Sequence, residues 1–248
     1  MVRSGKIFFA SDFHLGLSAG TSPIEREKKI VRWLDTIAAE AEEIYLLGDI
    51  FDFWWEYKLV VPRGFTRFLG KVSSITDSGI PVHFFTGNHD MWVGDYLTKE
   101  CGVIMHTGPF TNTFNGRKFH LAHGEGLGSK SIGYKILLWI FHNKFLRVLY
   151  SALPSSIGVG IGHRWSLSSR LSKGISLKFL GEDKEDLIRY ASSVSAKEQM
   201  DYFVFGHRHL AIIYKMKEGG EIIFLGDWIK HCSYAEWDGN NLNLKIFD

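Results

Sequence analysis

The sequence is poor in cysteine and has no long hydrophobic run. Its 248 residues include only two cysteines, Cys101 and Cys232, which excludes a disulfide framework and a cysteine-based zinc site. The start, MVRSGKIFFASD, lacks the apolar core of about 7–15 residues that a signal peptide needs. The most apolar stretch, 133–153, has an uninterrupted apolar run only over 136–141, whereas a membrane span needs about 20 residues. These absences predict a cytosolic, reduced protein.

Acidic residues are missing from one long segment. Residues 126–181 contain eight Lys or Arg and no Asp or Glu. Because the whole chain carries +2, removing these eight charges leaves −6 for the rest. A basic block in an otherwise acidic protein favours contact with phosphate, a lipid headgroup or nucleic acid, although a merely solvated basic face is the alternative.

The first half of the chain alternates strand and helix patterns. Short apolar runs at 6–11, 43–49 and 81–87 predict strands, and helices are expected at 22–40, which opens on Ser22-Pro23, and at about 65–78. Asn115-Gly116 between two alternating runs indicates a hairpin, and several further strands, expected to be antiparallel, follow residue 201. We therefore predict a four-layer αββα sandwich, one domain over 1–248, with a mostly helical insertion at about 126–181.

The apolar strands end in residues that bind metals. Each such cluster directly follows a strand, so the side chains can converge at one edge of the sheets. The clusters are Asp12 and His14 in SDFHLG, Asp49 in GDIFD, Asn88, His89 and Asp90 in GNHD, His123 in AHGEG, and His207 and His209 in GHRH.

This set of histidine, aspartate and asparagine side chains has nitrogen and oxygen donors but no thiolate, which suits Mn²⁺, Zn²⁺ or Fe²⁺. Without His89 and Asp90, four His, two Asp and one Asn remain, and these seven ligands are too many for one tetrahedral ion and enough for two if one carboxylate bridges. Two ions about 3.5–4 Å apart can activate a nucleophile and clamp a phosphoryl oxygen. Asp12 and His14, two residues apart on an extended strand, would point the same way.

In this order, D-x-H, G-D-x-x-D, G-N-H-D, H-G and G-H-x-H resemble the motifs of the calcineurin-like metallophosphoesterases, from Lys6 to about Asp227. The resemblance implies two divalent ions, with Mn²⁺ expected. It assigns one ion to Asp12, His14, Asp49 and His209, and the other to Asp49, Asn88, His123 and His207. His89 would contact the phosphoryl group, with Asp90 orienting it and Asp52 supporting the loop. The implied catalytic residues are His89, Asp49 and Asn88.

Within that family the chain resembles the UDP-2,3-diacylglucosamine diphosphatases of lipid A biosynthesis, through SDFHLG, GDIFDFW, the basic insertion and LGDW at 225–228. The resemblance implies cleavage of the diphosphate to 2,3-diacylglucosamine 1-phosphate and UMP, at the cytoplasmic face of the inner membrane. It also implies substrate contacts by Asn88, His89, His207, Ser166, Arg170 and Lys173, the last three within WSLSSRLSK. Neither nucleic acid nor an obligate protein partner is expected.

One motif departs from the diphosphatases, which have Arg where this chain has His89. The departure is compatible with the same reaction and equally with a shifted substrate. A phosphodiesterase or nuclease is therefore the alternative, and a scaffold without catalysis is a remote one. The basic residues of 126–181 are interleaved with Leu, Ile, Phe and Val, which favours a lipid over a nucleic acid.

Two aromatic features leave alternatives open. Residues 51–57, FDFWWEY, either pack on the core or form an aromatic wall beside the metals. Residues 133–153, taken as one helix, have an apolar stripe expected to anchor on a core: Leu137, Leu138, Phe141, Phe145, Val148 and Leu149. Trp139, Leu146 and Tyr150 form a second arc, which either lines an acyl-chain slot or membrane surface, or packs under another helix of the insertion.

Overall fold

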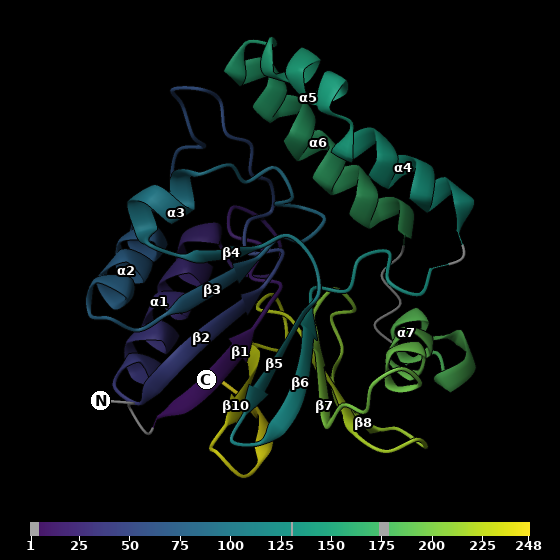
Figure 1. The fold of residues 1–248 in the computed structure, drawn as a ribbon. Helices are drawn as coiled ribbons and strands as arrows, with labels where there is room; N and C mark the ends of the chain where they lie inside the picture. The colour runs from purple at the N-terminus through teal and green to yellow at the C-terminus, as the bar shows by residue number, and fades with distance from the viewer. Residues whose placement is uncertain (1–4, 130, 174–178) are drawn as a thin grey trace.

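A computed structural model describes residues 5–129, 131–173 and 179–248, with the side chains of 134, 135, 142, 163 and 167–173 outside the description. Two β-sheets pack face to face, with helices outside them (Figure 1). The first sheet has the order β11 (Leu242–Ile246), β10 (Ser233–Trp237), β1 (Lys6–Ala10), β2 (Ala41–Leu47), β3 (Val82–Phe85) and β4 (Ile104–His106). The second has the order β5 (Phe110–Phe114), β6 (Arg117–Ala122), β7 (Tyr202–Phe205), β9 (Glu221–Leu225) and β8 (Ala211–Lys215).

Period-two alternation builds the layers. In β1, Ile7 and Phe9 lie in the core between the sheets, whereas Phe8 and Ala10 face the helices α1 (Pro23–Ala38), α2 (Thr66–Asp77) and α3 (Tyr96–Cys101). The outer face of the second sheet packs against α7 (Asp186–Ser195), preceded by the short η1 (Glu182–Lys184). The predicted αββα sandwich is confirmed, and both predicted N-terminal helices form.

Local sequence signals explain several element boundaries. The Ser22 Oγ accepts a hydrogen bond from the Glu25 amide at 3.3 Å, which caps α1. Asn115 and Gly116 both have positive φ, 49° and 79°, as a two-residue turn between β5 and β6 requires.

The expectation that the C-terminal strands are all antiparallel is wrong. β7 runs parallel to β6 and β9, whereas β8–β9, β10–β11 and β1–β10 are antiparallel pairs. The hairpin partner β8 lies at the sheet edge, so β9 is free to pair with β7 in parallel orientation. β10 then leaves this sheet and pairs with β1 of the other.

Residues 132–173 form three helices, α4 (Ile132–His142), α5 (Lys144–Ser151) and α6 (Ser155–Lys173), which we call the α4–α6 segment. It lies across one end of the sandwich (Figure 1). The prediction of one continuous helix over 133–153 is wrong. Asn143 interrupts it, because its Oδ1 accepts hydrogen bonds from the amides of Phe145 and Leu146 and so caps a new helix.

Candidate metal centre

Parallel strands bring the predicted ligands to one end of the sandwich. β1, β2 and β3 are parallel in one sheet, and β6, β7 and β9 are parallel in the other. The loops after their carboxyl ends carry the candidate ligands. They are joined across the sheets, since the Trp228 amide donates to the Asp12 carbonyl at 3.1 Å and the His207 amide donates to Asp12 Oδ2 at 3.0 Å.

The backbone is strained at these loops. Eight non-glycine residues of the described chain have positive φ, and five of them are candidate ligands: Asp12, His14, Asp49, His207 and His209. This conformation costs an L-residue roughly 1–2 kcal/mol, so its concentration here points to a functional requirement. The expectation that Asp12 and His14 share an extended strand is wrong, since β1 ends at Ala10 and the chain turns at both residues.

The side chains nevertheless meet. Donor atoms of Asp12, His14 and His209 lie within 4.8 Å of one another, as do those of Asp49, His123 and His207. Asp49 lies between the two groups, because its Oδ2 is 3.9 Å from His14 Nε2 and 3.4 Å from His123 Nε2. His89 also brings a donor atom into a group with His14 and Asp49, at the edge of the centre.

Buried polar atoms test whether these residues fit metal ions. Asp12 Oδ1, Asn88 Oδ1 and His123 Nε2 are buried without a hydrogen-bond partner among the described residues. Leaving such a group unsatisfied costs about 1–3 kcal/mol, and cations between the two groups would satisfy all three. The histidine and aspartate clusters are therefore suited to a dimetal site.

Polar contacts on the far side of each ring orient the histidines. His123 Nδ1 lies 2.7 Å from the Leu47 carbonyl, and His209 Nδ1 lies 3.3 Å from Asp227 Oδ2. Both contacts leave Nε2 facing the carboxylates, the arrangement found in metal-bound histidines. Asp227 was not identified from the sequence as the residue that orients His209, although Asp227 lies in the LGDW motif.

Electrostatics keep the central carboxylates ionised. Burial by itself would raise the pKa of Asp12, but the charge of His209 and the nearby imidazole of His14 outweigh it, and the pKa is lowered. For Asp49 burial is again opposed, here by the charges of His123 and His89, and the pKa falls well below its usual range. Burial lowers the pKa of His123, yet Asp49 raises it well above the usual value, so binding of a cation there must displace a proton.

The role expected for Asp90 is wrong. Its carboxylate accepts hydrogen bonds from the amides of Gly87 and Ile50, both at 2.7 Å, and so joins the loop after β3 to the loop after β2. His89 is oriented instead by Asp52, whose backbone carbonyl lies 2.9 Å from His89 Nδ1.

The expected substrate contacts of the α4–α6 segment have different outcomes. Ser166 is buried, and its hydroxyl donates to Asp52 Oδ2 at 2.9 Å. The side chains of Arg170 and Lys173 lie outside the described residues. Of the others, Asn88 and His89 line a small polar pocket with Ser166, and His207 is half-buried beside His123.

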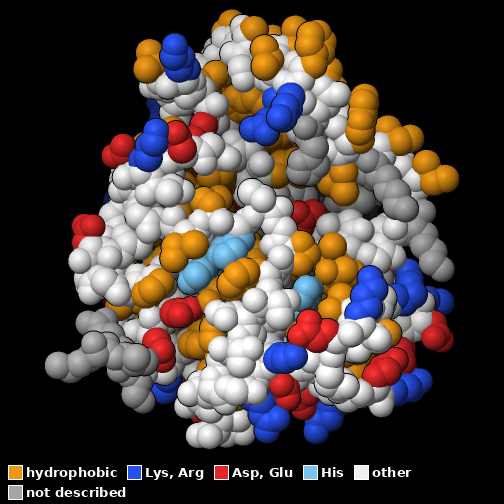
Figure 2. Space-filling view, viewed as in Figure 1, with side chains coloured by type: hydrophobic (Ala, Val, Ile, Leu, Met, Phe, Trp, Pro, Cys, Tyr) orange, Lys and Arg blue, Asp and Glu red, His pale blue; other side chains and the backbone are white. Residues whose placement is uncertain are grey.

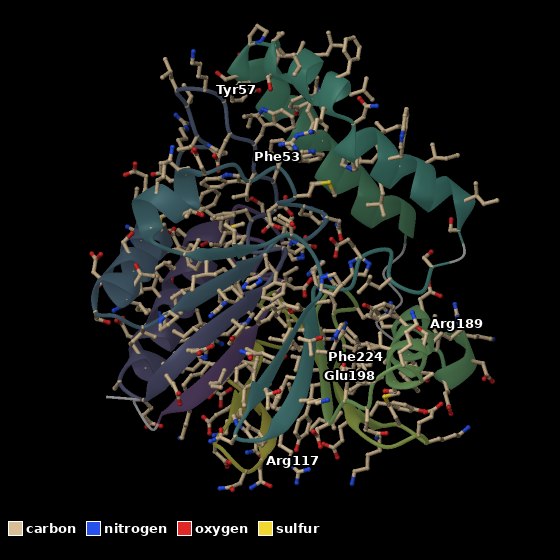
Figure 3. All side chains as sticks on the ribbon, in the orientation of Figure 1. Phe53, Tyr57, Arg117, Arg189, Glu198 and Phe224 are labelled. Atoms are coloured by element: carbon tan, nitrogen blue, oxygen red, sulfur yellow. The ribbon has the colours of Figure 1, made fainter. Side chains whose placement is uncertain are left out.

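The aromatic side chains of residues 51–57 are divided between the core and the α4–α6 segment, and only Phe53 also lines the pocket that contains Asn88 and His89. Phe51 and Trp54 are in the core, whereas Phe53 and Trp55 line an apolar cavity of about 180 Å³ under α4–α6. Phe53 and Tyr57 lie on the loop that faces these helices (Figure 3). The cavity adjoins the polar pocket, because Phe53, Trp92, Gly162 and Trp165 line both.

The two predicted faces of 133–153 are partly exchanged in the structure. Beyond the break at Asn143, the supposed anchoring residues Phe145, Val148 and Leu149 are exposed, at 73%, 69% and 59%. From the second arc, Leu146 and Tyr150 line the cavity. Trp139 is 64% exposed, and orange apolar side chains gather where these helices lie (Figure 2).

Among the described residues, no helix is both long enough and apolar enough to traverse a bilayer.

Comparison with known proteins shows which family the chain belongs to and which proteins it resembles. The family described as "Calcineurin-like phosphoesterase" matches residues 5–211, so the chain belongs to this family, as its motifs predicted. A Porphyromonas gingivalis relative named UDP-2,3-diacylglucosamine hydrolase is 43% identical over 257 residues, covering 98% of each chain. Relatives of the same name from Histophilus somni (strain 129Pt) and Escherichia coli O7:K1 are 26% and 25% identical, each covering 96% of this chain and 99% and 98% of theirs.

Proposed function

We propose that this protein hydrolyses the diphosphate of UDP-2,3-diacylglucosamine, producing 2,3-diacylglucosamine 1-phosphate and UMP. The observation that most directly supports this proposal is that an apolar cavity and a polar pocket share a wall next to the His–Asp centre. A substrate whose acylated sugar is attached directly to a diphosphate matches an apolar cavity that adjoins a polar pocket. The full-length similarity to relatives named for this substrate supports the same assignment.

We assign one ion to Asp12, His14, Asp49 and His209, and the second to Asp49, Asn88, His123 and His207, with Mn²⁺ as the expected metal. When bound, the two ions would supply a nucleophile at neutral pH and offset negative charge on the phosphoryl oxygens. Asp49, between both groups, would be the shared ligand, and its lowered pKa keeps it ionised for that role.

His89 is the proposed phosphoryl contact. Its Nδ1 lies 2.9 Å from the Asp52 carbonyl, which can only accept, so Nδ1 carries a proton and Nε2 is left for the substrate. Attack by water on the α-phosphorus breaks the bond to the bridging oxygen, and a proton held at Nε2 can pass to that oxygen as it leaves. Asn88 lines the same pocket and would hold a phosphoryl oxygen.

The helical insertion at about 126–181 would act as a lid carrying the acyl site, with Arg170 and Lys173 as contacts for the sugar phosphate. Its exposed apolar residues, beside Lys144, Arg147 and Arg164 and with no acidic residue in the segment, match a peripheral contact with an anionic membrane surface. We place the protein at the cytoplasmic face of the inner membrane.

The test incubates purified protein with Mn²⁺ and UDP-2,3-diacylglucosamine and measures UMP release, with His209→Ala as the matched inactive control. Turnover of this substrate by the wild type alone is expected. Rapid hydrolysis of a cyclic nucleotide or of a nuclease substrate, together with none of the lipid, would refute the assignment in favour of the phosphodiesterase alternative.

A second test addresses the membrane. Wild-type protein should sediment with vesicles of phosphatidylglycerol and phosphatidylcholine, whereas a variant with Phe145→Ser and Val148→Ser should bind more weakly at equal thermal stability. Equal binding of both proteins would rule out this face as the contact.

A further inference from the structure

Ser166 belongs to α6, yet its hydroxyl is engaged by a loop of the metal centre. The side chain is about 1% exposed, and Oγ donates to Asp52 Oδ2 at 2.9 Å, between residues 114 positions apart. A hydrogen bond from a hydroxyl to an ionised carboxylate is among the stronger kinds in proteins. In this arrangement the hydroxyl is therefore bound to a carboxylate of the protein.

Asp52 makes two further contacts inside the centre. Its Oδ1 lies 3.8 Å from His14 Nδ1, an electrostatic contact beyond hydrogen-bond length. Its backbone carbonyl lies 2.9 Å from His89 Nδ1, which is also 3.3 Å from Ser166 Oγ. One residue thus joins a candidate ligand, the candidate phosphoryl contact and helix α6.

Close approach of α6 at this point depends on a glycine. A Cβ at Gly162, one turn before Ser166, would lie 2.2 Å from the ring of Phe53, which directly follows Asp52 in sequence. Residues four apart share one face of a helix. Two successive turns of α6 therefore rest on the same loop, one by packing and one by the hydrogen bond.

We infer that Ser166 is a positioning residue that couples the docking of α6 to metal binding through Asp52. The inference rests on the proposed dimetal function. With Ser166 bound, the Asp52 carboxylate is held beside His14 and keeps the imidazole oriented, an effect that raises the affinity of a ligand for its ion. Coupling of two equilibria is reciprocal, so bound metal must stabilise the docked α6 by the same factor.

The experiment uses the metal-free full chain and no substrate. Mn²⁺ binding is measured by titration calorimetry, and amide hydrogen exchange of α6 is measured with and without Mn²⁺. Ser166→Ala removes the donor, and Ser156→Ala, an exposed serine of the same helix, is the control. We expect Ser166→Ala to bind Mn²⁺ about fivefold or more weakly and to lose the Mn²⁺-dependent protection of α6, while Ser156→Ala retains both.

Asp52→Asn provides a second variant. The amide oxygen still accepts from Ser166 but carries no charge beside His14, so Mn²⁺ affinity should fall while α6 stays protected in the metal-free protein. Wild-type Mn²⁺ affinity in Ser166→Ala, with unchanged Mn²⁺-dependent protection, would overturn the inference. So would a raised KM for substrate with unaltered Mn²⁺ binding, because that result would make Ser166 a substrate contact.

The two proposals fail separately. A wild-type protein that binds Mn²⁺ and releases no UMP refutes the proposed substrate, but the dependence of Mn²⁺ affinity on Ser166 still decides the coupling. A protein that releases UMP with equal Mn²⁺ affinity in wild type and Ser166→Ala refutes the coupling alone.

Discussion

The sandwich and the α4–α6 segment use the same apolar residue types in opposite ways. In the sandwich, three clusters bury the large aliphatic and aromatic side chains of the core, including Trp33, Trp228 and Trp237. Among the described side chains of the α4–α6 segment, seven large apolar ones are more than half exposed: Ile132, Ile136, Trp139, Phe145, Val148, Leu149 and Ile157.

The difference separates stability from binding. Burial of apolar area stabilises a fold by roughly 25 cal/mol per Å², and the exposed faces of α4 and α5 gain nothing from this. Contiguous exposed apolar surface in a globular protein usually marks a place of interaction. The sandwich therefore holds the loops of the candidate metal centre in place, and the helices carry the surface and the cavity at which we propose that an apolar ligand binds.

The largest expected effect concerns the metal centre. His209→Ala should lower hydrolysis by more than about a hundredfold, because even residues that only orient a metal ligand contribute 10–100-fold. The melting temperature in the absence of metal should change little. Hydrolysis within a few-fold of wild type would show that the proposed two-ion assignment is wrong.

A tryptophan pair tests the comparison directly. Trp33 is fully buried against Phe13 and Trp228, whereas Trp139 is 64% exposed. Trp33→Ala should lower the free energy of unfolding by about 3–5 kcal/mol, and Trp139→Ala by less than about 0.5 kcal/mol, both measured by urea denaturation. A loss of comparable size at both positions would abolish the distinction between the two regions.

Asp227 provides a smaller effect at the metal centre. Asp227→Asn removes the charge behind His209 and should weaken Mn²⁺ binding about 10–100-fold, measured by calorimetry. Lys230→Ala is a matched control in the same loop, since its side chain is exposed. Unchanged affinity in Asp227→Asn would mean that the 3.3 Å contact with His209 Nδ1 does not support the ligand.

The smallest effect is a pH dependence within the sandwich. Burial, followed by the charge of His83, lowers the pKa of His106 to about 4 from 6.5. Between these values the unfolded chain binds more protons than the folded one, so this contribution to stability is present above pH 6.5 and is lost as pH falls toward about 4. His106→Gln should therefore lose less stability than wild type between pH 7.5 and 5 in urea titrations.

Much of the fold and centre could be predicted because the signals are local. Strand alternation, the Ser22 cap and the Asn115-Gly116 turn depend on neighbours in sequence, and all formed as expected. The candidate ligands were found because each follows an apolar strand, and parallel strands end at a common edge.

Other features could not be predicted because they depend on partners distant in sequence. The carboxylate of Asp90 had an equally plausible use beside His89, and only the approach of the loop after β2 assigns it to backbone amides. The break at Asn143 exchanged which side of the following helix faces the cavity. The hydrophobic periodicity was calculated for one uninterrupted helix, so it cannot include the change in which side chains face the cavity after the break.

The sequence by itself determined the layers of the sandwich and the chemistry of its loops, because side-chain type and spacing decide which faces are buried and which atoms can bind a cation. The tertiary structure alone decided how those atoms are supported. Asp227 reaches His209, and Asp52 joins His14, His89 and Ser166, across separations of up to 114 residues. Such contacts carry no periodic signal, since they exist only after the sheets have packed and α6 has come to rest on the loop.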